Sequence, residues 1–334
     1  MNKHILSFSL FEANASTGSA KFSFTFPEGK YKREDIPADK LEILRKDLIP
    51  IFNQIKTPTK ANLKTVINLV ASTSKKALSP ELKKELETEG FKSTGNGNDA
   101  LANARLKTLE DIMSEILVKN LGTTLDVFKK NVQIAKTPKP NSGEGESFQY
   151  ISSAVDQTGD PFPEDKKMGC NVNKEFKGVQ GQKSNNFVGY SDDLWLPFPA
   201  GQEVEIEFFT YMVPDCVYIK YGDQEFLSGF VGSGSGGPRQ EELTQLNQNG
   251  DLVNSIQSVM KSLGSNKTVK DLDPKFIEPK TKFMGGLERL VRIKEADPQN
   301  SKFTIKKKFG ADKLYIRVFS PLDKTMFKIK TICK

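Results

Sequence analysis

The sequence predicts an α+β protein of two domains, an α/β domain followed by a mainly antiparallel β domain. The chain has 334 residues, about twice the length of a typical domain. Strand-like runs alternate with helical ones in the first part, and short β-branched and aromatic runs dominate the second. Between them, residues 138–150 (PKPNSGEGESFQY) mix Pro, Gly, Ser and Glu without an apolar period. We therefore expect domains at residues 1–137 and 151–334, joined by a linker at 138–150.

The strands of the first domain are predicted from three kinds of apolar run. Residues 5–11 form a short apolar stretch, and Phe22, Phe24 and Phe26 then alternate with polar residues, which is the period of a half-buried strand. Residues 65–71 (TVINLVA) are nearly all β-branched or apolar, as expected of a central strand covered on both faces. A last strand is predicted at 131–135.

Three helices are predicted between these strands. Leucine and isoleucine recur every three or four residues over 41–55, although Pro50 should kink or shorten this helix. Ser79 followed by proline is an N-terminal capping signal for a short helix at 81–89. A third helix, at 101–121, carries apolar side chains on one side. The first domain thus reads strand, helix, strand, helix, strand, with a helical insertion.

The second domain is predicted to be a β-sandwich or jelly roll. Residues 203–208 alternate glutamate with apolar residues, and a Gly-Asp turn at 222–223 predicts a hairpin. Three lysine-rich alternating runs near the end of the chain supply further strands, and lysines also discourage edge pairing. A helical insertion is expected at about 238–282. Its apolar face consists of Leu252, Ile256, Val259, Met260 and Leu263.

Composition excludes several classes of function. The net charge of +7 is spread along the chain, so we expect no nucleic-acid binding. The single histidine, His4, excludes histidine-based triads and histidine-rich metal sites. No apolar run is long enough for a membrane span, and the first residues do not resemble a signal peptide. Cys170, Cys216 and Cys333 are too few for a disulfide framework, which favours a reducing cytoplasm.

Catalytic and cofactor-binding motifs are missing from the sequence. It contains neither a nucleophile elbow, nor a Cys–His pair, nor a cluster of metal ligands. The glycine-rich stretch 232–237 lacks the G-K-[ST] ending of a phosphate-binding loop. We expect no enzyme activity, no cofactor and no metal.

One helical motif resembles a known family. Asn98, Leu101, Ala102, Arg105 and Leu106 follow the spacing N-x-x-L-[SA]-x-x-R-[AL]. This spacing resembles the start of the second helix in OmpA-like (OmpA C-terminal, MotB-like) domains. The predicted order of elements agrees with that family over about residues 20–137. The resemblance implies that the first domain is an OmpA-like α/β sandwich.

The resemblance also implies a ligand pocket with one altered residue. In the family, an aspartate and an arginine hold the amino and carboxyl groups of diaminopimelate in peptidoglycan. Arg105 occupies the arginine position, but Ser74 occupies the aspartate position, and the motif adds Asn98. Serine cannot neutralise an ammonium group, which would cost about 1–3 kcal/mol of binding. About 20 inserted residues, at 75–97, would also roof the pocket. We expect a degenerate pocket in a domain used for docking.

The alternative for these residues is purely structural. Arg105 would then be a surface arginine that pairs with Asp99 or Glu110, and Ser74 a turn residue. If Ser74 has replaced the aspartate opposite Arg105, replacing Arg105 with alanine is expected to matter little to the protein's role.

A second resemblance covers about residues 190–334. The stretch MVPDCVYIKYGDQEFLSGFVG is similar to small β-sandwich modules appended to bacterial and phage surface proteins. Such modules are generally non-catalytic, and some are thought to contact glycans. Trp195 would be the candidate sugar-stacking residue, with a place in the core as the alternative.

The expected function is that of a non-enzymatic structural or assembly protein. We expect a component of a phage virion or its tail, at the baseplate or a fibre anchor, assembled in the host cytoplasm. Its partners would be other virion proteins and further copies of this chain. The alternative is a peptidoglycan- or glycan-binding protein of the bacterial cell envelope. This expectation rests on the two resemblances and on the missing export signal.

Overall fold

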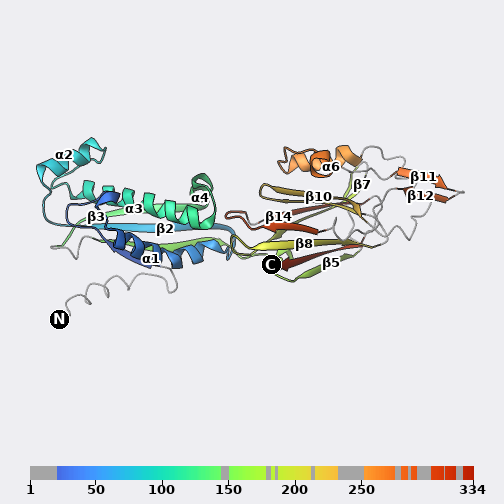
Figure 1. The fold of residues 1–334 in the computed structure, drawn as a ribbon, viewed down its shortest axis with the longest axis horizontal. Coiled ribbons are helices and arrows are strands. Elements are labelled where there is room, and N and C mark those ends of the chain that lie inside the picture. Colours follow the sequence, from blue (N-terminus) through green and yellow to red (C-terminus); the bar gives the residue numbers. More distant parts are fainter. Residues whose placement is uncertain are drawn as a thin grey trace. The chain divides into compact units, whose positions relative to one another are not determined.

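The structure is a computed structural model that divides the chain into two compact units (Figure 1). Unit 1 ends at Pro161 and unit 2 begins at Phe162. Both are described below from the following residues: 21–143, 150–177, 182–184, 187–211, 215–231, 252–274, 280–284, 287–291, 302–311, 313–320 and 326–334. The predicted strand at 5–11, His4 and the glycine-rich stretch 232–237 lie outside the described residues.

Unit 1 is built on a four-stranded mixed sheet. Its strands are β1 (Lys21–Thr25), β2 (Ala61–Ser74), β3 (Val132–Gly143) and β4 (Tyr150–Asp160). The strand order is β1-β4-β2-β3, with β2 parallel to β3 and the other neighbours antiparallel. Ile67 therefore lies between Val155 on β4 and Ile134 on β3.

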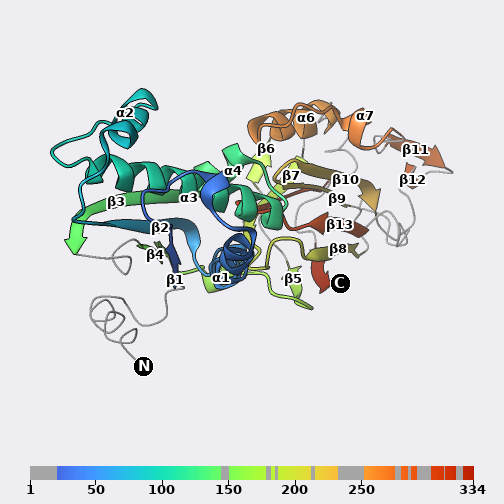
Figure 2. The same cartoon turned by 60° about the vertical axis from the view of Figure 1, so that its left-hand side comes forward.

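The helices of unit 1 cover one face of this sheet. They are α1 (Ala38–Lys56), α2 (Pro80–Thr88), α3 (Asn98–Leu121) and α4 (Leu125–Asn131). α3 packs on β2 and β3, α1 packs on β1, and α2 lies beside the beginning of α3 (Figure 2). Along β2, Ile67 and Leu69 are fully buried, whereas Val66 and Val70 on the other face are only half-buried. The expectation that this central strand is covered on both faces is therefore wrong.

Helix α1 bears on the expectation that Pro50 kinks or shortens it. The helix runs from Ala38 through Pro50 to Lys56, so the proline does not shorten it. Its buried residues lie on one side, as its leucine and isoleucine spacing predicts: Leu44, Leu48, Ile51 and Ile55. Pro50 is exposed on the other side, where water can satisfy the carbonyl group that its missing N–H leaves unpaired.

The expected linker at 138–150 is not a linker over its described residues. Residues 138–143 extend β3, which the sequence predicted only as far as residue 135, and Tyr150 begins β4. Pro138 and Pro140 fit because β3 is an edge strand, and proline is tolerated at sheet edges. β4 lies between β1 and β2, so unit 1 needs residues well beyond 137. The boundary at 161/162 replaces the expected domain limits.

Unit 2 consists mainly of two antiparallel sheets. Its strands are β5 (Asn173–Lys177), β6 (Gln182–Ser184), β7 (Phe187–Trp195), β8 (Glu203–Thr210), β9 (Asp215–Tyr221), β10 (Gln224–Val231), β13 (Lys302–Lys306), β14 (Lys313–Ser320) and β15 (Met326–Cys333). One sheet has the order β10-β9-β14-β7-β6 and the other β13-β8-β15-β5. Side chains from both sheets share one hydrophobic core, including Ile206 and Phe208 from β8 and Val217 and Ile219 from β9. The expected antiparallel β unit is confirmed at this level.

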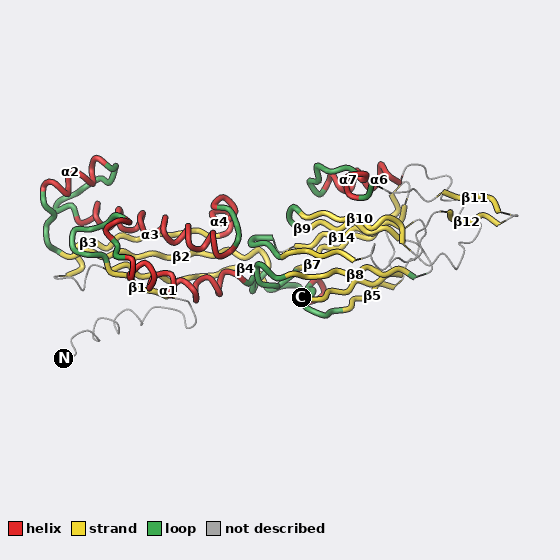
Figure 3. Tube along the Cα trace, viewed as in Figure 1, coloured by secondary structure: helices red, strands yellow, loops and turns green. Residues whose placement is uncertain are grey.

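The helical insertion of unit 2 covers the outer side of the first sheet (Figure 3). It contains α6 (Leu252–Ser262) and α7 (Val269–Leu272). Ile256 and Met260 pack with Cys216 and Tyr218 of β9 in a second hydrophobic cluster. Apart from Leu252, whose side chain lies outside the described part, the apolar face predicted for α6 packs in this cluster. Beyond α7, the expected helical segment ends in a β-hairpin of β11 (Lys280–Met284) and β12 (Leu287–Val291).

Two further observations bear on the cysteines and on membranes. Cys170 and Cys333 are joined by a disulfide, which the cysteine count did not predict, and Cys216 is a buried thiol. Among the helices that the structure describes, none combines the length and the apolar character of a membrane span.

Candidate functional site

Asn98 connects the beginning of α3 to the end of β2. Its side-chain amide donates to the carbonyl oxygens of Ser74 at 2.7 Å and Lys76 at 3.1 Å, and to Asn141 Oδ1 at 2.9 Å. The Thr73 hydroxyl donates back to the Asn98 carbonyl oxygen. The structure thus brings together two of the three predicted pocket residues, Ser74 and Asn98. Both are buried, and the Asn98 amide is spent on holding the chain's own loops.

Arg105 lies two turns further along α3 and is 0% exposed. Its Nε donates to the Lys30 carbonyl oxygen at 2.8 Å, and its Nη2 donates to the Pro27 carbonyl oxygen at 2.9 Å. The guanidinium also lies over the ring of Phe26, 5.4 Å from its centroid. Arg105 therefore supports the turn that follows β1.

This geometry corrects both sequence-based accounts of Arg105. It is not a surface arginine paired with Asp99 or Glu110, because Asp99 accepts from Thr94 and Glu110 pairs with Lys136. It also does not present its guanidinium to solvent, where a ligand carboxylate would meet it. Burial lowers the pKa of Arg105 to about 10, so it remains a cation at neutral pH.

Helix α2, which lies within the inserted residues 75–97, covers the turn that Arg105 supports. Gly29 has a left-handed φ of 66°, and a Cβ at this position would lie 3.6 Å from Leu82 of α2. Below α2, Leu86 and Tyr31 are buried in one cluster with Ala100, Leu101 and Ala104 of α3. The insertion at 75–97 thus roofs this part of unit 1, as the sequence predicted.

Polar and charged side chains hold the insertion at 75–97 against the segment that follows β1. The Tyr31 hydroxyl donates to Glu85 at 3.1 Å, and Lys32 pairs with Glu85 at 2.6 Å and with Glu89 at 3.0 Å. Burial and the neighbouring carboxylates raise the pKa of Tyr31, and hydrogen bonds to Glu85 and Glu89 raise the pKa of Lys32. No local pattern in the sequence signals this group, because Tyr31 and Glu85 are 54 residues apart.

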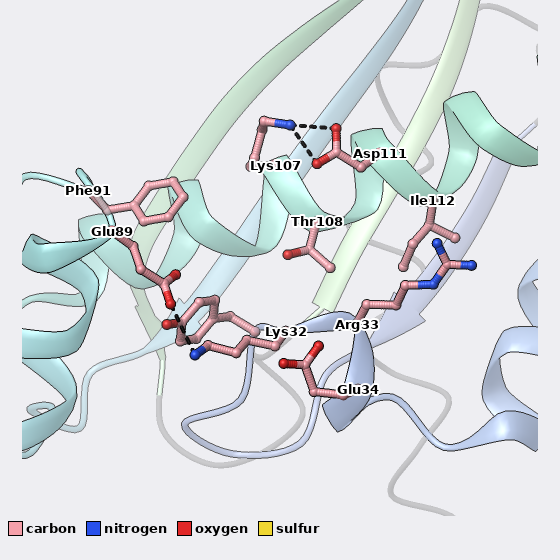
Figure 4. Close-up of a pocket in the computed structure, with 10 residues that line it drawn as sticks. Lys32, Arg33, Glu34, Glu89, Phe91, Lys107, Thr108, Asp111 and Ile112 are labelled. Carbon is pink, nitrogen blue, oxygen red and sulfur yellow. Dashed lines mark hydrogen bonds and ion pairs between the residues drawn. The ribbon is translucent and has the colours of Figure 1, made fainter.

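A hollow of about 410 Å³ lies beside these contacts of Tyr31 and Lys32 (Figure 4). It is lined by Tyr31, Lys32, Arg33, Glu34, Glu89, Phe91, Lys107, Thr108, Asp111 and Ile112. Its three cations already have carboxylate partners within the chain: Lys32 with Glu85 and Glu89, Arg33 with Glu115, and Lys107 with Asp111. Each cation that lines the hollow is therefore already matched by a carboxylate.

Trp195 is not presented for sugar stacking. Only 8% of the residue is exposed, and its ring packs 5.6 Å from that of Phe162. Lys313 Nζ lies 4.8 Å from the ring centroid. The alternative of a core residue therefore describes Trp195, and the expected glycan contact is wrong for this structure.

In the part of the chain that the structure describes, no three His, Cys, Asp or Glu side chains group as metal ligands. No known family model matches the chain, and no curated protein matches it either.

Proposed function

We propose that this protein is a non-enzymatic structural or assembly protein that docks through an OmpA-like first unit. The assembly we favour is a phage virion or its tail, with the protein at a baseplate or fibre anchor. Its partners would be other proteins of the particle and further copies of this chain. The β-rich second unit would serve as a stable, non-catalytic module.

The order of elements in unit 1 supports the OmpA-like part of this proposal. A strand, a helix and a strand that ends at Ser74 precede the helix that carries Asn98 and Arg105. This is the order expected from the motif resemblance. A fold alone does not define a function, so the proposed docking role rests on the pocket residues.

The observation that carries the docking role is the engagement of Arg105 with the protein's own backbone. A zwitterionic ligand needs a carboxylate for its ammonium group and an accessible guanidinium for its carboxylate. Ser74 supplies no charge, and Arg105 is fully buried and donates to Pro27 and Lys30. Residues that would hold a ligand thus stabilise the fold instead.

The disulfide favours keeping the cell envelope as the alternative. Disulfides persist in the periplasm and on the surfaces of cells and virions, and are rare in a reducing cytoplasm. The Cys170–Cys333 bond therefore fits either a virion or an envelope protein. In the second case the first unit would bind peptidoglycan or the second a glycan.

A sedimentation assay with insoluble peptidoglycan separates these two functions. We expect the full chain to stay in the supernatant, and Ser74→Asp to remain there too because Arg105 is covered. Arg45→Ala, at an exposed position of α1, is the control for surface charge. Pelleting of the wild-type chain with micromolar affinity would overturn the docking proposal. Mass spectrometry of purified virions that encode this chain tests the assembly. If the chain is absent from those virions, it is not a virion component.

A further inference from the structure

The disulfide joins the two ends of unit 2. Cys170 precedes β5 and Cys333 is the last residue of β15, 163 positions further along the chain. We propose that this bond is a redox clasp, formed after unit 2 has folded and entered an oxidising environment, which locks the C-terminal strand into its sheet. The proposal does not depend on the function proposed above.

Non-covalent contacts already hold the two cysteines together. β15 pairs with β5 from Met326, opposite Lys177, to Lys330, opposite Asn173. Beyond that pairing, the Thr331 amide donates to the Val172 carbonyl oxygen at 3.0 Å, and its hydroxyl donates to the Gly169 carbonyl oxygen at 2.6 Å. These contacts place the two cysteine Cα atoms 5.4 Å apart, within the range for a disulfide. Folding of the reduced chain is therefore sufficient to align the thiols.

The accessibility of the three cysteines makes the pairing selective. Cys170 is exposed and Cys333 is half-buried, so soluble oxidants and reductants can reach them. Cys216 is 0% exposed beneath α6, and burial raises the pKa of its thiol. A thiol without thiolate character does not take part in exchange. The bond between Cys170 and Cys333 is thus the one that can respond to the environment.

The clasp acts on a strand whose loss would divide a sheet. β15 lies between β8 and β5, and its Phe327 and Ile329 side chains belong to the shared core. A covalent bond at Cys333 prevents β15 from leaving without breaking the bond, so the redox state sets how often this strand opens.

Glutathione disulfide is the oxidant we assign to the reaction. The thiolate of one cysteine attacks a sulfur of glutathione disulfide, which forms a mixed disulfide and releases one glutathione thiolate. The second cysteine, as its thiolate, attacks the protein sulfur of the mixed disulfide and releases the second glutathione. Two protein thiols are oxidised and one glutathione disulfide is reduced, and the two protons that leave the cysteines are taken up by the released glutathione thiolates to give two glutathiones.

The test measures thiols and strand opening on the full chain. The protein is made in a reducing cytoplasm, its thiols are trapped by alkylation at lysis, and the alkylated cysteines are counted by mass spectrometry after unfolding. Untrapped protein is equilibrated in glutathione buffers of increasing oxidation, and hydrogen exchange is followed in residues 326–333. We expect three free thiols at lysis and one, at Cys216, after oxidation. Exchange in β15 should slow on the order of 100-fold on oxidation, a typical effect of a disulfide.

Two variants control the measurement. Cys216→Ser should oxidise and exchange as the wild type does. The double variant Cys170→Ser with Cys333→Ser should exchange like the reduced wild type in every buffer. A bond already complete at lysis, a bond that includes Cys216, or equal exchange of β15 in both redox states would overturn the proposal.

Discussion

Arg105 is the residue at which the structure most changes the expected result of a mutation. Burial lowers the pKa of its guanidinium from its ordinary value to about 10, which corresponds to about 3 kcal/mol of unfavourable desolvation. Against this stand two hydrogen bonds from a charged donor, each contributing about 1.5–3 kcal/mol. The buried aliphatic part of the side chain also packs within unit 1, and its removal would leave a cavity.

We therefore expect Arg105→Ala to lower the free energy of unfolding of unit 1 by about 2–5 kcal/mol. Arg105→Met fills most of the volume of the side chain and removes the desolvation cost. It should therefore lower the free energy of unfolding less than Arg105→Ala does, and the difference should be about the energy of the cavity that alanine leaves. Arg45→Ala is the matched control, because this exposed arginine pairs with its neighbour Glu42 on the helix surface, and it should change stability by less than about 0.5 kcal/mol.

The assay is urea unfolding of the full chain, with hydrogen exchange in α3 to assign the transition to unit 1. The dependence of the free energy on urea should be unchanged, which shows that the variants lose stability and not compactness. If Arg105→Ala is as stable as Arg45→Ala, the guanidinium does not support the turn at Pro27 and Lys30. The surface account of Arg105 would then be correct.

Three further predictions concern the domain limits, the roof over α3 and the charged face of unit 2. A chain that ends at residue 137 should fail to fold, since it lacks β4, the strand between β1 and β2. A chain that ends at residue 161 should give a dispersed amide NMR spectrum, and a folded product from the shorter chain would contradict the boundary. Leu86→Ala should cost about 2–5 kcal/mol, because Leu86 is fully buried, and it should speed hydrogen exchange in α2; unchanged exchange would show that α2 is not held by this contact. Lys302 lowers the pKa of Glu207 through a hydrogen bond, so the stability from this carboxylate is present above its unfolded pKa and is lost as the pH falls through the lower folded value. Unit 2 should therefore lose less stability on acidification in Glu207→Gln than in the wild type, measured by thermal unfolding from about pH 5 to about pH 3, and equal losses would exclude the pair as a source of acid sensitivity.

The sequence by itself determined most of the elements and which side of each faces a core. The leucine spacing of α1 and the alternation in β8 are local patterns, and most of the apolar side chains that they place on one side are buried. Glu207 of β8 is an exception, because it is buried although the alternation places it on the polar side. The family resemblance led us to expect that the insertion at 75–97 roofs the site, and α2 within it packs over the turn beside Arg105. Local periodicity carries this information because it reports how one element meets solvent and core.

Only the tertiary structure decided which distant segments meet. Proline, glycine and serine at 138–143 fit a linker or an edge strand equally well, and the order of strands in the sheet selects the edge strand. Arg105 has carbonyl partners 75 and 78 positions away, and Cys170 has its partner 163 positions away. Such contacts depend on how the elements pack, whereas composition and spacing report only each residue's own segment. The buried role of Arg105 and the disulfide were therefore beyond the reach of the sequence alone.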